Sequence, residues 1–216
     1  MKKAVIFDMD GVLVDSQPFH FEMDRAVLAA CGHEVPQTVV ERYAGMASHN
    51  RWAKYKNDLA LAQSVDELVA MQTATMMARL DETDFHPISG IPELLAMLRA
   101  KGLRLAVASS SSYEFVCNML DKLGICDAFA QIVSGEDMRN SKPAPDIFLY
   151  AAKKLDCLPA DCVVVEDSAN GVRAAVAAEI DCVAYRNVTS GEQDLTGASR
   201  IVTAYAELLA DVSWLK

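Results

Sequence analysis

Short apolar segments alternate with amphipathic segments along most of the 216-residue chain. Several of the apolar segments are apolar at every position, as strands are when both faces of a parallel sheet are covered. The alternation of such strands with helical patterns predicts an α/β fold with a Rossmann-like parallel sheet. The predicted strands are residues 4–7, 103–108, 131–133, 162–165, 181–185 and 200–202.

Four amphipathic segments are predicted to form the helices that cover this sheet. In the first of them, Ile91, Leu94, Leu95 and Leu98 share one helical face, and Gly102 follows as a C-terminal cap signal. The third of them is predicted to begin at Ala144, where Pro143 lies near its first turn. The four predicted helices are residues 91–98, 116–123, 144–155 and 168–178.

Residues 15–85 interrupt this alternation, because they contain helical patterns and no convincing strand. A βαβ unit needs only about 30 residues, so a separation this long between a first strand and the next sheet element indicates an insertion. We therefore predict two domains. Residues 1–14 and 88–216 form the α/β domain, and residues 15–87 form an inserted helical domain.

Two carboxylates follow the first predicted strand. Asp8 and Asp10 leave the strand end together, and Gly11 permits a sharp turn directly after them. Paired carboxylates can bind a hard cation through oxygen. They can also divide the labour of catalysis, one acting as a nucleophile and the other exchanging protons. A plain turn is the competing interpretation, because Asp and Gly are common turn residues.

Three later strand ends carry further polar residues. Ser109 and Ser110 begin a run of four serines before a helix, Lys142 precedes another helix, and Glu166 and Asp167 follow the fourth strand. Taken singly, these are ordinary helix caps and a surface lysine. Taken together at one sheet edge, they offer carboxylates for Mg²⁺ and hydroxyl, ammonium and N–H groups for phosphate, which is what phosphoryl transfer needs.

Charge, cysteine spacing and the length of the apolar segments argue against several other classes of protein. Twenty basic and thirty acidic residues give a formal net charge of −10, which disfavours a nucleic-acid partner. No two of the six cysteines have the spacing of a zinc or redox motif, which fits a cytoplasmic protein. No apolar segment is long enough for a signal peptide or a membrane span. The sequence has no heptad repeat of apolar residues, so we expect the protein to be a monomer.

The motifs resemble those of the haloacid dehalogenase superfamily of phosphatases, and the similarity covers nearly the whole chain. The chain is most similar to the β-phosphoglucomutase-like branch, which has a helical cap inserted after the first motif. The matching residues, in chain order, are Asp8 and Asp10 within DMDGV, Ser109, Lys142 within KPAPD, and Glu166 with Asp167.

The resemblance implies a role for each residue. Asp8 is expected to attack phosphorus and form an aspartyl-phosphate, while Asp10 protonates the leaving oxygen and then activates water. Ser109 and Lys142 are expected to hold the phosphoryl oxygens, with Ser110 beside them. The expected cofactor is Mg²⁺, with Asp8, Asp10 and Asp167 as ligands and Glu166 acting through a bound water.

The inserted helical segment bears on the choice between phosphatase and mutase. Mutases of this branch have an arginine shortly after a Gly-Val-Ser stretch, whereas here Gly45, Met46 and Ser48 occupy that region and the first arginine after them is Arg51. His20 matches a cap histidine of the mutases, but no lysine stands where its partner is expected. We therefore predict hydrolysis of a small sugar or polyol phosphate. β-Phosphoglucomutase is the alternative, and a non-catalytic phosphate-binding regulatory module is a third interpretation.

Overall fold

The computed structural model describes residues 1–43, 46 and 48–216, apart from the side chain of residue 137. The chain forms two compact units. We call Met1–Asp15 together with Phe85–Lys216 the sheet unit, and Ser16–Asp84 the helical unit. Among the described residues, no helix combines the length and the apolar composition that crossing a membrane requires.

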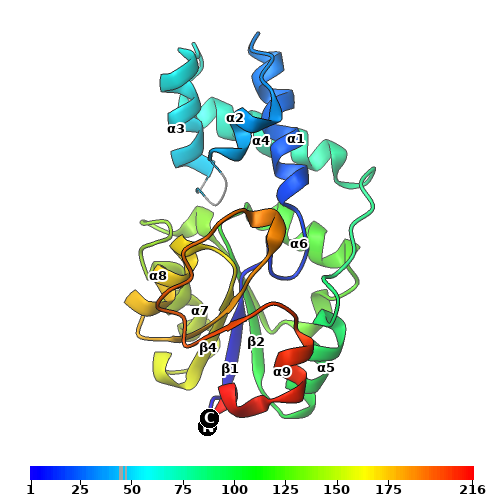
Figure 1. Ribbon diagram of the computed structural model, residues 1–216, viewed down its shortest axis with the longest axis vertical. Helices are drawn as coiled ribbons and strands as arrows, with labels where there is room; N and C mark the ends of the chain where they lie inside the picture. The colour runs from blue at the N-terminus through cyan, green and yellow to red at the C-terminus, as the bar shows by residue number, and fades with distance from the viewer. Residues whose placement is uncertain (44–45, 47) are drawn as a thin grey trace. The chain divides into compact units, whose positions relative to one another are not determined.

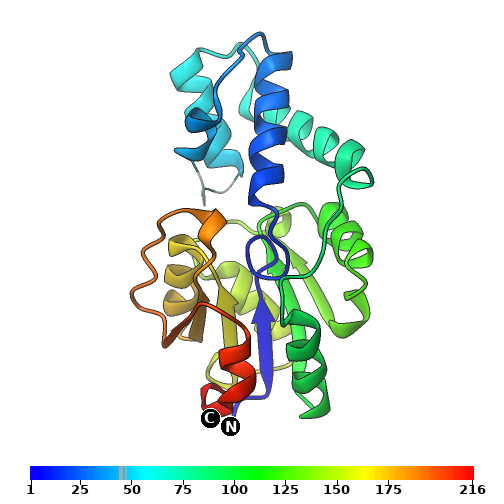
Figure 2. The same ribbon diagram turned by 45° about the vertical axis from the view of Figure 1, so that its right-hand side comes forward.

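The sheet unit is built on six parallel strands in the order β3-β2-β1-β4-β5-β6, which Figure 2 shows as a twisted sheet. β1 and β4 are buried at every residue, as the uninterrupted apolar sequences of residues 4–7 and 162–165 predict, and the last residue of β4 is the buried Glu166. The predicted α/β fold is confirmed. The strands are β1 (Ala4–Phe7), β2 (Arg104–Ser109), β3 (Gln131–Ser134), β4 (Cys162–Glu166), β5 (Asp181–Tyr185) and β6 (Arg200–Val202).

Helices cover both faces of this sheet. On one face, α7 packs against β1, β2 and β3, and α8 packs against β4 and β5, in a core that includes Ala4, Ile6 and Ala106. Figure 1 shows α7 and α8 on one side of β1, and α5 and α9 on the other. The helices of this unit are α5 (Ile91–Ala100), α6 (Tyr113–Lys122), α7 (Asp146–Lys154), α8 (Ala169–Ala177) and α9 (Ala206–Ala210). Short 3-10 turns lie at Cys126–Ala128, Gly135–Asp137, Pro159–Asp161, Val188–Ser190 and Val212–Leu215.

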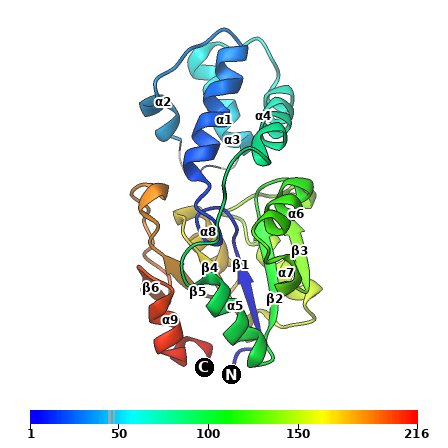
Figure 3. The same cartoon turned by 90° about the vertical axis from the view of Figure 1, so that its right-hand side faces the viewer.

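In its described residues, the helical unit consists of α1 (Gln17–Ala30), α2 (Gln37–Glu41), α3 (Ser48–Leu59) and α4 (Val65–Leu80), shown in Figure 3. Its core gathers apolar side chains from all four helices around Trp52. The Trp52 ring is completely buried, so its role is to pack in this core.

The start of α7 differs from the prediction. The helix begins at Asp146 rather than at Ala144, and Pro145 rather than Pro143 occupies its N-terminal cap. The physical reason is that helical conformation is disfavoured for a residue preceding proline, which favours a helix start after Ala144 and Pro145. β2 begins and ends one residue later than predicted, at Arg104 and Ser109, and β3 and β4 each extend one residue further, to Ser134 and Glu166.

Candidate active site

The carboxyl ends of the three central strands bring the predicted residues of the sheet unit together. β1 pairs with both β2 and β4, and Phe7 lies opposite Val107 and Val165. Asp8 therefore follows β1 at the level where β2 and β4 also end, and its backbone N–H donates to the Val165 carbonyl at 3.0 Å. Buried Ser109 and Glu166 are the last residues of the two neighbouring strands.

Lys142 lies at the centre of this group. Its Nζ donates to Asp8 Oδ1 at 2.5 Å, to Glu166 Oε1 at 2.8 Å and to the Ala108 carbonyl at 3.3 Å. The side chain is only 7% exposed, and its ammonium lies 4.8 Å from the centre of the Phe148 ring. Lys142 is thus held in place by contacts from several elements, which a surface lysine is not.

Burial and like charge act against ionisation of these carboxyl groups. Burial raises the pKa of Asp8, and the nearby Glu166 and Asp10 raise it further, against the effect of Lys142. Burial also raises the pKa of Asp167, with Glu166 and Asp8 adding to it. Burial would lower the pKa of Lys142, but Asp8 and Glu166 together raise it, so this side chain is a permanent cation.

Glu166 is fixed through both of its carboxylate oxygens. Oε1 accepts from Lys142, and Oε2 accepts from the backbone N–H groups of Asp167 and Ser168 at 2.7 Å each. The carboxylate occupies the space beside Gly171, where an added Cβ would lie 1.7 Å from Oε1. A glycine in the first turn of α8 therefore makes room for this acidic side chain.

Asp10 is contacted by serines from the end of β2 and the turn after it. Its Oδ2 accepts from Ser111 Oγ at 2.9 Å and from Ser109 Oγ at 3.4 Å. Ser111 was not singled out from the sequence, because four consecutive serines give no signal of which one turns toward the acid. Ser110 is exposed, and Ser112 caps α6 through its hydroxyl, as a serine in a strand-to-helix turn often does.

Asp167 has a partner that sequence analysis missed. Ser190 Oγ donates a short hydrogen bond to Asp167 Oδ2. Ser190 follows β5 in a segment that matches no motif, and 23 residues separate the two positions. Only the folded structure brings this hydroxyl to the acidic group.

The chemistry of this group fits a divalent cation. In the described part of the sheet unit, buried Lys142 contacts Asp8 and Glu166, and the charges of Asp10 and Asp167 act on the same acidic group, so acidic side chains outnumber the cation. Carboxylate oxygens are the donors that Mg²⁺ prefers. Within the described residues, no three acidic, imidazole or thiol groups already form a compact metal cluster. The fit therefore rests on charge and donor type.

The remaining predicted residues belong to the helical unit, where Gly45 lies outside the described residues. His20 is half-buried on α1, with its ring edge-on to Phe19. Ser48 Oγ donates to Gln72 Oε1 at 3.0 Å, and the Met46 carbonyl accepts from Arg51 at 3.0 Å. Ser48 and Met46 thus take part in the internal contacts of this unit.

Arg51 is committed to a buried ion pair. Its Nε lies 2.8 Å from Asp24 Oδ2, and both side chains are almost completely buried. Asp24 also accepts from Gln72 Nε2 at 2.5 Å and from Tyr55 Oη at 3.1 Å. The guanidinium therefore balances an internal acid of the helical unit.

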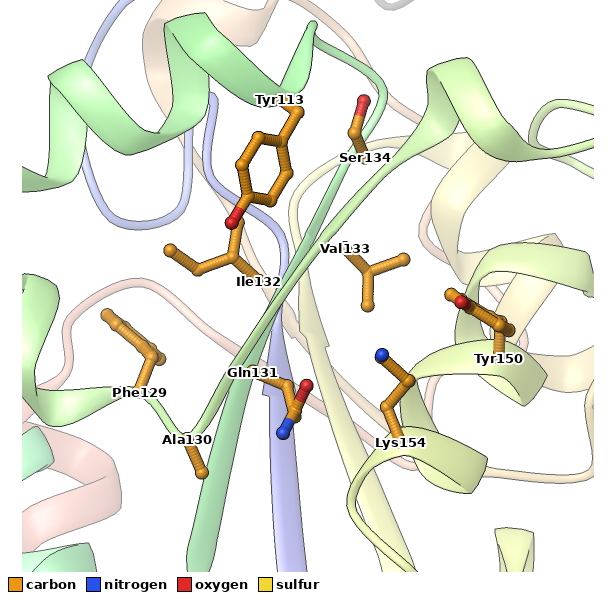
Figure 4. Close-up of a pocket in the computed structure, with 9 residues that line it drawn as sticks. All are labelled: Tyr113, Phe129, Ala130, Gln131, Ile132, Val133, Ser134, Tyr150 and Lys154. Atoms are coloured by element: carbon orange, nitrogen blue, oxygen red, sulfur yellow. The ribbon is translucent and has the colours of Figure 1, made fainter.

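A cavity of about 360 Å³ lies along the edge strand β3 and is lined by nine residues, none of them acidic. Figure 4 shows Tyr113, Tyr150 and Lys154 around this strand. Ser134 in its lining donates to the Ser111 carbonyl at 2.7 Å, but Asp8, Asp10, Lys142, Glu166 and Asp167 are absent from it. The cavity therefore lacks the groups that phosphoryl chemistry requires.

Comparison with known proteins identifies relatives of this arrangement. Residues 5–185 match the family described as haloacid dehalogenase-like hydrolase. Hexitol phosphatase B of Escherichia coli K12 is 32% identical over 184 residues, 82% of this chain and 80% of that protein. β-Phosphoglucomutase of Bacillus subtilis is 30% identical over 220 residues, 97% of this chain and 93% of that protein.

A solved structure is similar over nearly the full chain. It is a variant of CbbY from Rhodobacter sphaeroides in complex with xylulose-1,5-bisphosphate, with a TM-score of 0.85, 27% identity and 96% of each chain covered. The predicted enzyme class, a phosphatase of the haloacid dehalogenase type, is confirmed, and the interpretation as a non-catalytic module is not supported. The chain belongs to the family of haloacid dehalogenase-like hydrolases.

Proposed function

We propose that this protein is a Mg²⁺-dependent phosphohydrolase of small sugar or polyol phosphates that acts through an aspartyl-phosphate on Asp8. The observation that carries the proposal is the buried Lys142 ammonium, which joins Asp8 and Glu166 at the carboxyl edge of the sheet. A buried cation beside a buried carboxylate reduces the repulsion between that carboxylate and an anionic phosphate.

In this mechanism Asp8 supplies the attacking oxygen and Lys142 fixes its orientation. Asp10 donates a proton to the leaving oxygen and then accepts one from the water that cleaves the aspartyl-phosphate, since the two steps need an acid and then a base. The contacts from Ser109 and Ser111 hold the Asp10 carboxylate in one position. Ser109, Ser110 and Lys142 are the proposed phosphate-binding groups.

Mg²⁺ would be held by Asp8, Asp167 and Asp10, the last through its backbone carbonyl, with Glu166 acting through a bound water. When bound, it supplies positive charge to the phosphoryl oxygens. Because burial raises the pKa of Asp8 and Asp167, a cation here also favours the ionised forms that the reaction needs.

The helical unit supplies an argument for a phosphatase reaction over a mutase reaction, in which the phosphoryl group moves to another position of the sugar. A mutase must hold a second phosphate, and Arg51 is the first arginine after the stretch that precedes theirs in the mutases. Its guanidinium is occupied by buried Asp24. Releasing it would leave the buried Asp24 carboxylate without its cation, at a cost on the order of 3–5 kcal/mol. We infer that the helical unit is a cap that selects the leaving group without an arginine clamp from this position.

Phosphate release from a panel of hexitol and sugar phosphates tests this proposal. With Mg²⁺, wild-type protein should release phosphate, and Asp8→Asn, which keeps the size of the side chain, should release none. Ser199→Ala, an exposed hydroxyl deletion remote from the acidic group, serves as the control. Interconversion of β-glucose 1-phosphate and glucose 6-phosphate with little phosphate release would instead establish the mutase.

A further inference from the structure

The loop that follows β5, Asn187–Gln193, contains the hydroxyl that contacts the Asp167 carboxylate. Ser190 is 4% exposed, and its Oγ donates to Asp167 Oδ2. The Ser190 carbonyl in turn accepts from Gln193 Nε2 at 2.9 Å. The serine is thus held through its backbone while its side chain holds the acid.

Two further hydrogen bonds anchor the ends of this loop to the acidic motifs. Asn187 Nδ2 donates to the Gly11 carbonyl at 3.0 Å, directly after the first acidic pair. Gln193 Oε1 accepts from the Ala169 backbone N–H at 3.0 Å, at the start of α8. The loop therefore joins the segment after β1 to the segment after β4, and Ser190 lies between the two anchors.

Gly11 makes this arrangement possible. It adopts a φ of +83°, and a Cβ built on it would lie 2.1 Å from Asp167 Oδ2 and 3.0 Å from Ser190 Oγ. The carboxylate and the hydroxyl thus fill the space that a side chain would take. The packing against Gly11 and the hydrogen bond from Ser190 together restrict the rotation of the Asp167 carboxylate.

We propose that Ser190 is a positioning residue for the divalent cation: it fixes the Asp167 carboxylate through Oδ2 so that the group is preorganised as a metal ligand. This inference rests on the proposed function and assigns a role to a residue outside the motifs of the family. Residues that orient metal ligands typically contribute 10–100-fold to metal affinity. Loss of the Ser190 hydroxyl should therefore weaken Mg²⁺ binding by about 10-fold or more.

The test is isothermal titration calorimetry of Mg²⁺ into substrate-free wild-type protein and the Ser190→Ala and Ser199→Ala variants. Ser199 is exposed, and its hydroxyl donates to Asp181 Oδ1 at 3.4 Å and accepts from the Cys182 backbone N–H at 3.2 Å, so its deletion controls for the loss of a hydrogen-bonded hydroxyl as such. Ser190→Ala should show a Kd for Mg²⁺ raised about 10-fold or more. Ser199→Ala should match wild type.

A second measurement separates positioning from general damage. At saturating Mg²⁺, kcat of Ser190→Ala should return toward the wild-type value, because the serine acts on the ligand and not on the substrate. Ser190→Thr, which keeps the hydroxyl, should bind Mg²⁺ more tightly than Ser190→Ala and covers the case in which the alanine variant does not fold.

The outcomes distinguish the two proposals. If wild-type protein and Ser190→Ala bind Mg²⁺ with the same Kd, Ser190 does not position the ligand, and the proposed function is untouched. If wild-type protein binds no Mg²⁺ at all, the proposed Mg²⁺-dependent function fails, and the role of Ser190 fails with it.

Discussion

Replacing Gly171 by alanine tests how the buried Glu166 carboxylate is accommodated. In an ordinary helix this change removes the entropy cost of glycine and stabilises the protein by about 0.5–1 kcal/mol. Here the new Cβ would meet Glu166 Oε1 at 1.7 Å and Oε2 at 2.5 Å, so the carboxylate must move.

The contacts that the carboxylate would lose set the magnitude. Glu166 accepts two backbone N–H groups at 2.7 Å each, the Ser168 hydroxyl at 3.0 Å and the Lys142 ammonium at 2.8 Å. Hydrogen bonds to charged groups contribute about 1.5–3 kcal/mol each. Loss of two of them outweighs the helix gain, so Gly171→Ala should reduce the free energy of unfolding by about 2–5 kcal/mol.

Urea unfolding followed by circular dichroism measures this effect, and a double-mutant cycle isolates its cause. In a Glu166→Ala background the clash is absent, so adding Gly171→Ala should be neutral or stabilising. The reasoning is refuted if Gly171→Ala stabilises the otherwise wild-type protein, or if it destabilises both backgrounds equally.

Three further changes probe other parts of the molecule. Ser64→Ala should destabilise the protein by about 1 kcal/mol in urea unfolding near neutral pH, because the Ser64 hydroxyl caps α4. Hydrogen bonds from the Ser64 backbone and side chain also lower the pKa of Glu67. The stabilisation from this carboxylate is therefore present above its unfolded pKa and is lost as pH falls through its folded pKa, so the loss of stability in Ser64→Ala should be smaller in acid. Arg51→Met should cost about 3–5 kcal/mol in the same assay by leaving Asp24 buried without its cation, and a cost below about 1 kcal/mol would contradict the ion pair. Burial raises the pKa of Cys162 to about 12, so mass spectrometry should find this thiol unmodified after native treatment with iodoacetamide at about pH 8 and modified after denaturation.

Much of the fold follows from local pattern. β1, β5 and β6 were predicted with the bounds that the structure has. β1 is apolar and buried at every residue, as a strand covered on both faces is, whereas β5 and β6 each begin at a charged residue, Asp181 and Arg200. The start of α7 was predicted wrongly, because the restriction that Pro145 places on Ala144 was not considered.

The candidate site is less accessible from sequence. Asp8, Lys142 and Glu166 could be grouped in advance because parallel strands end at one edge, and the structure brings these three into contact. Ser111, Gly171 and Ser190 could not, because a hydroxyl contact or a missing Cβ depends on side-chain positions that leave no periodic signal. The catalytic roles assigned to Asp8, Lys142 and Glu166 stay predictions.

The central claim is that Asp8 carries the phosphoryl group during turnover. The most direct test uses Asp10→Asn, which keeps the nucleophile but lacks the group proposed to activate water. It is mixed with Mg²⁺ and 4-nitrophenyl phosphate, whose leaving group needs no proton, and then quenched in acid. Peptide mass spectrometry should find one phosphoryl group on Asp8, and none on that peptide in Asp8→Asn. Release of 4-nitrophenolate without a phosphorylated Asp8, or with the phosphoryl group on another residue, would contradict the account.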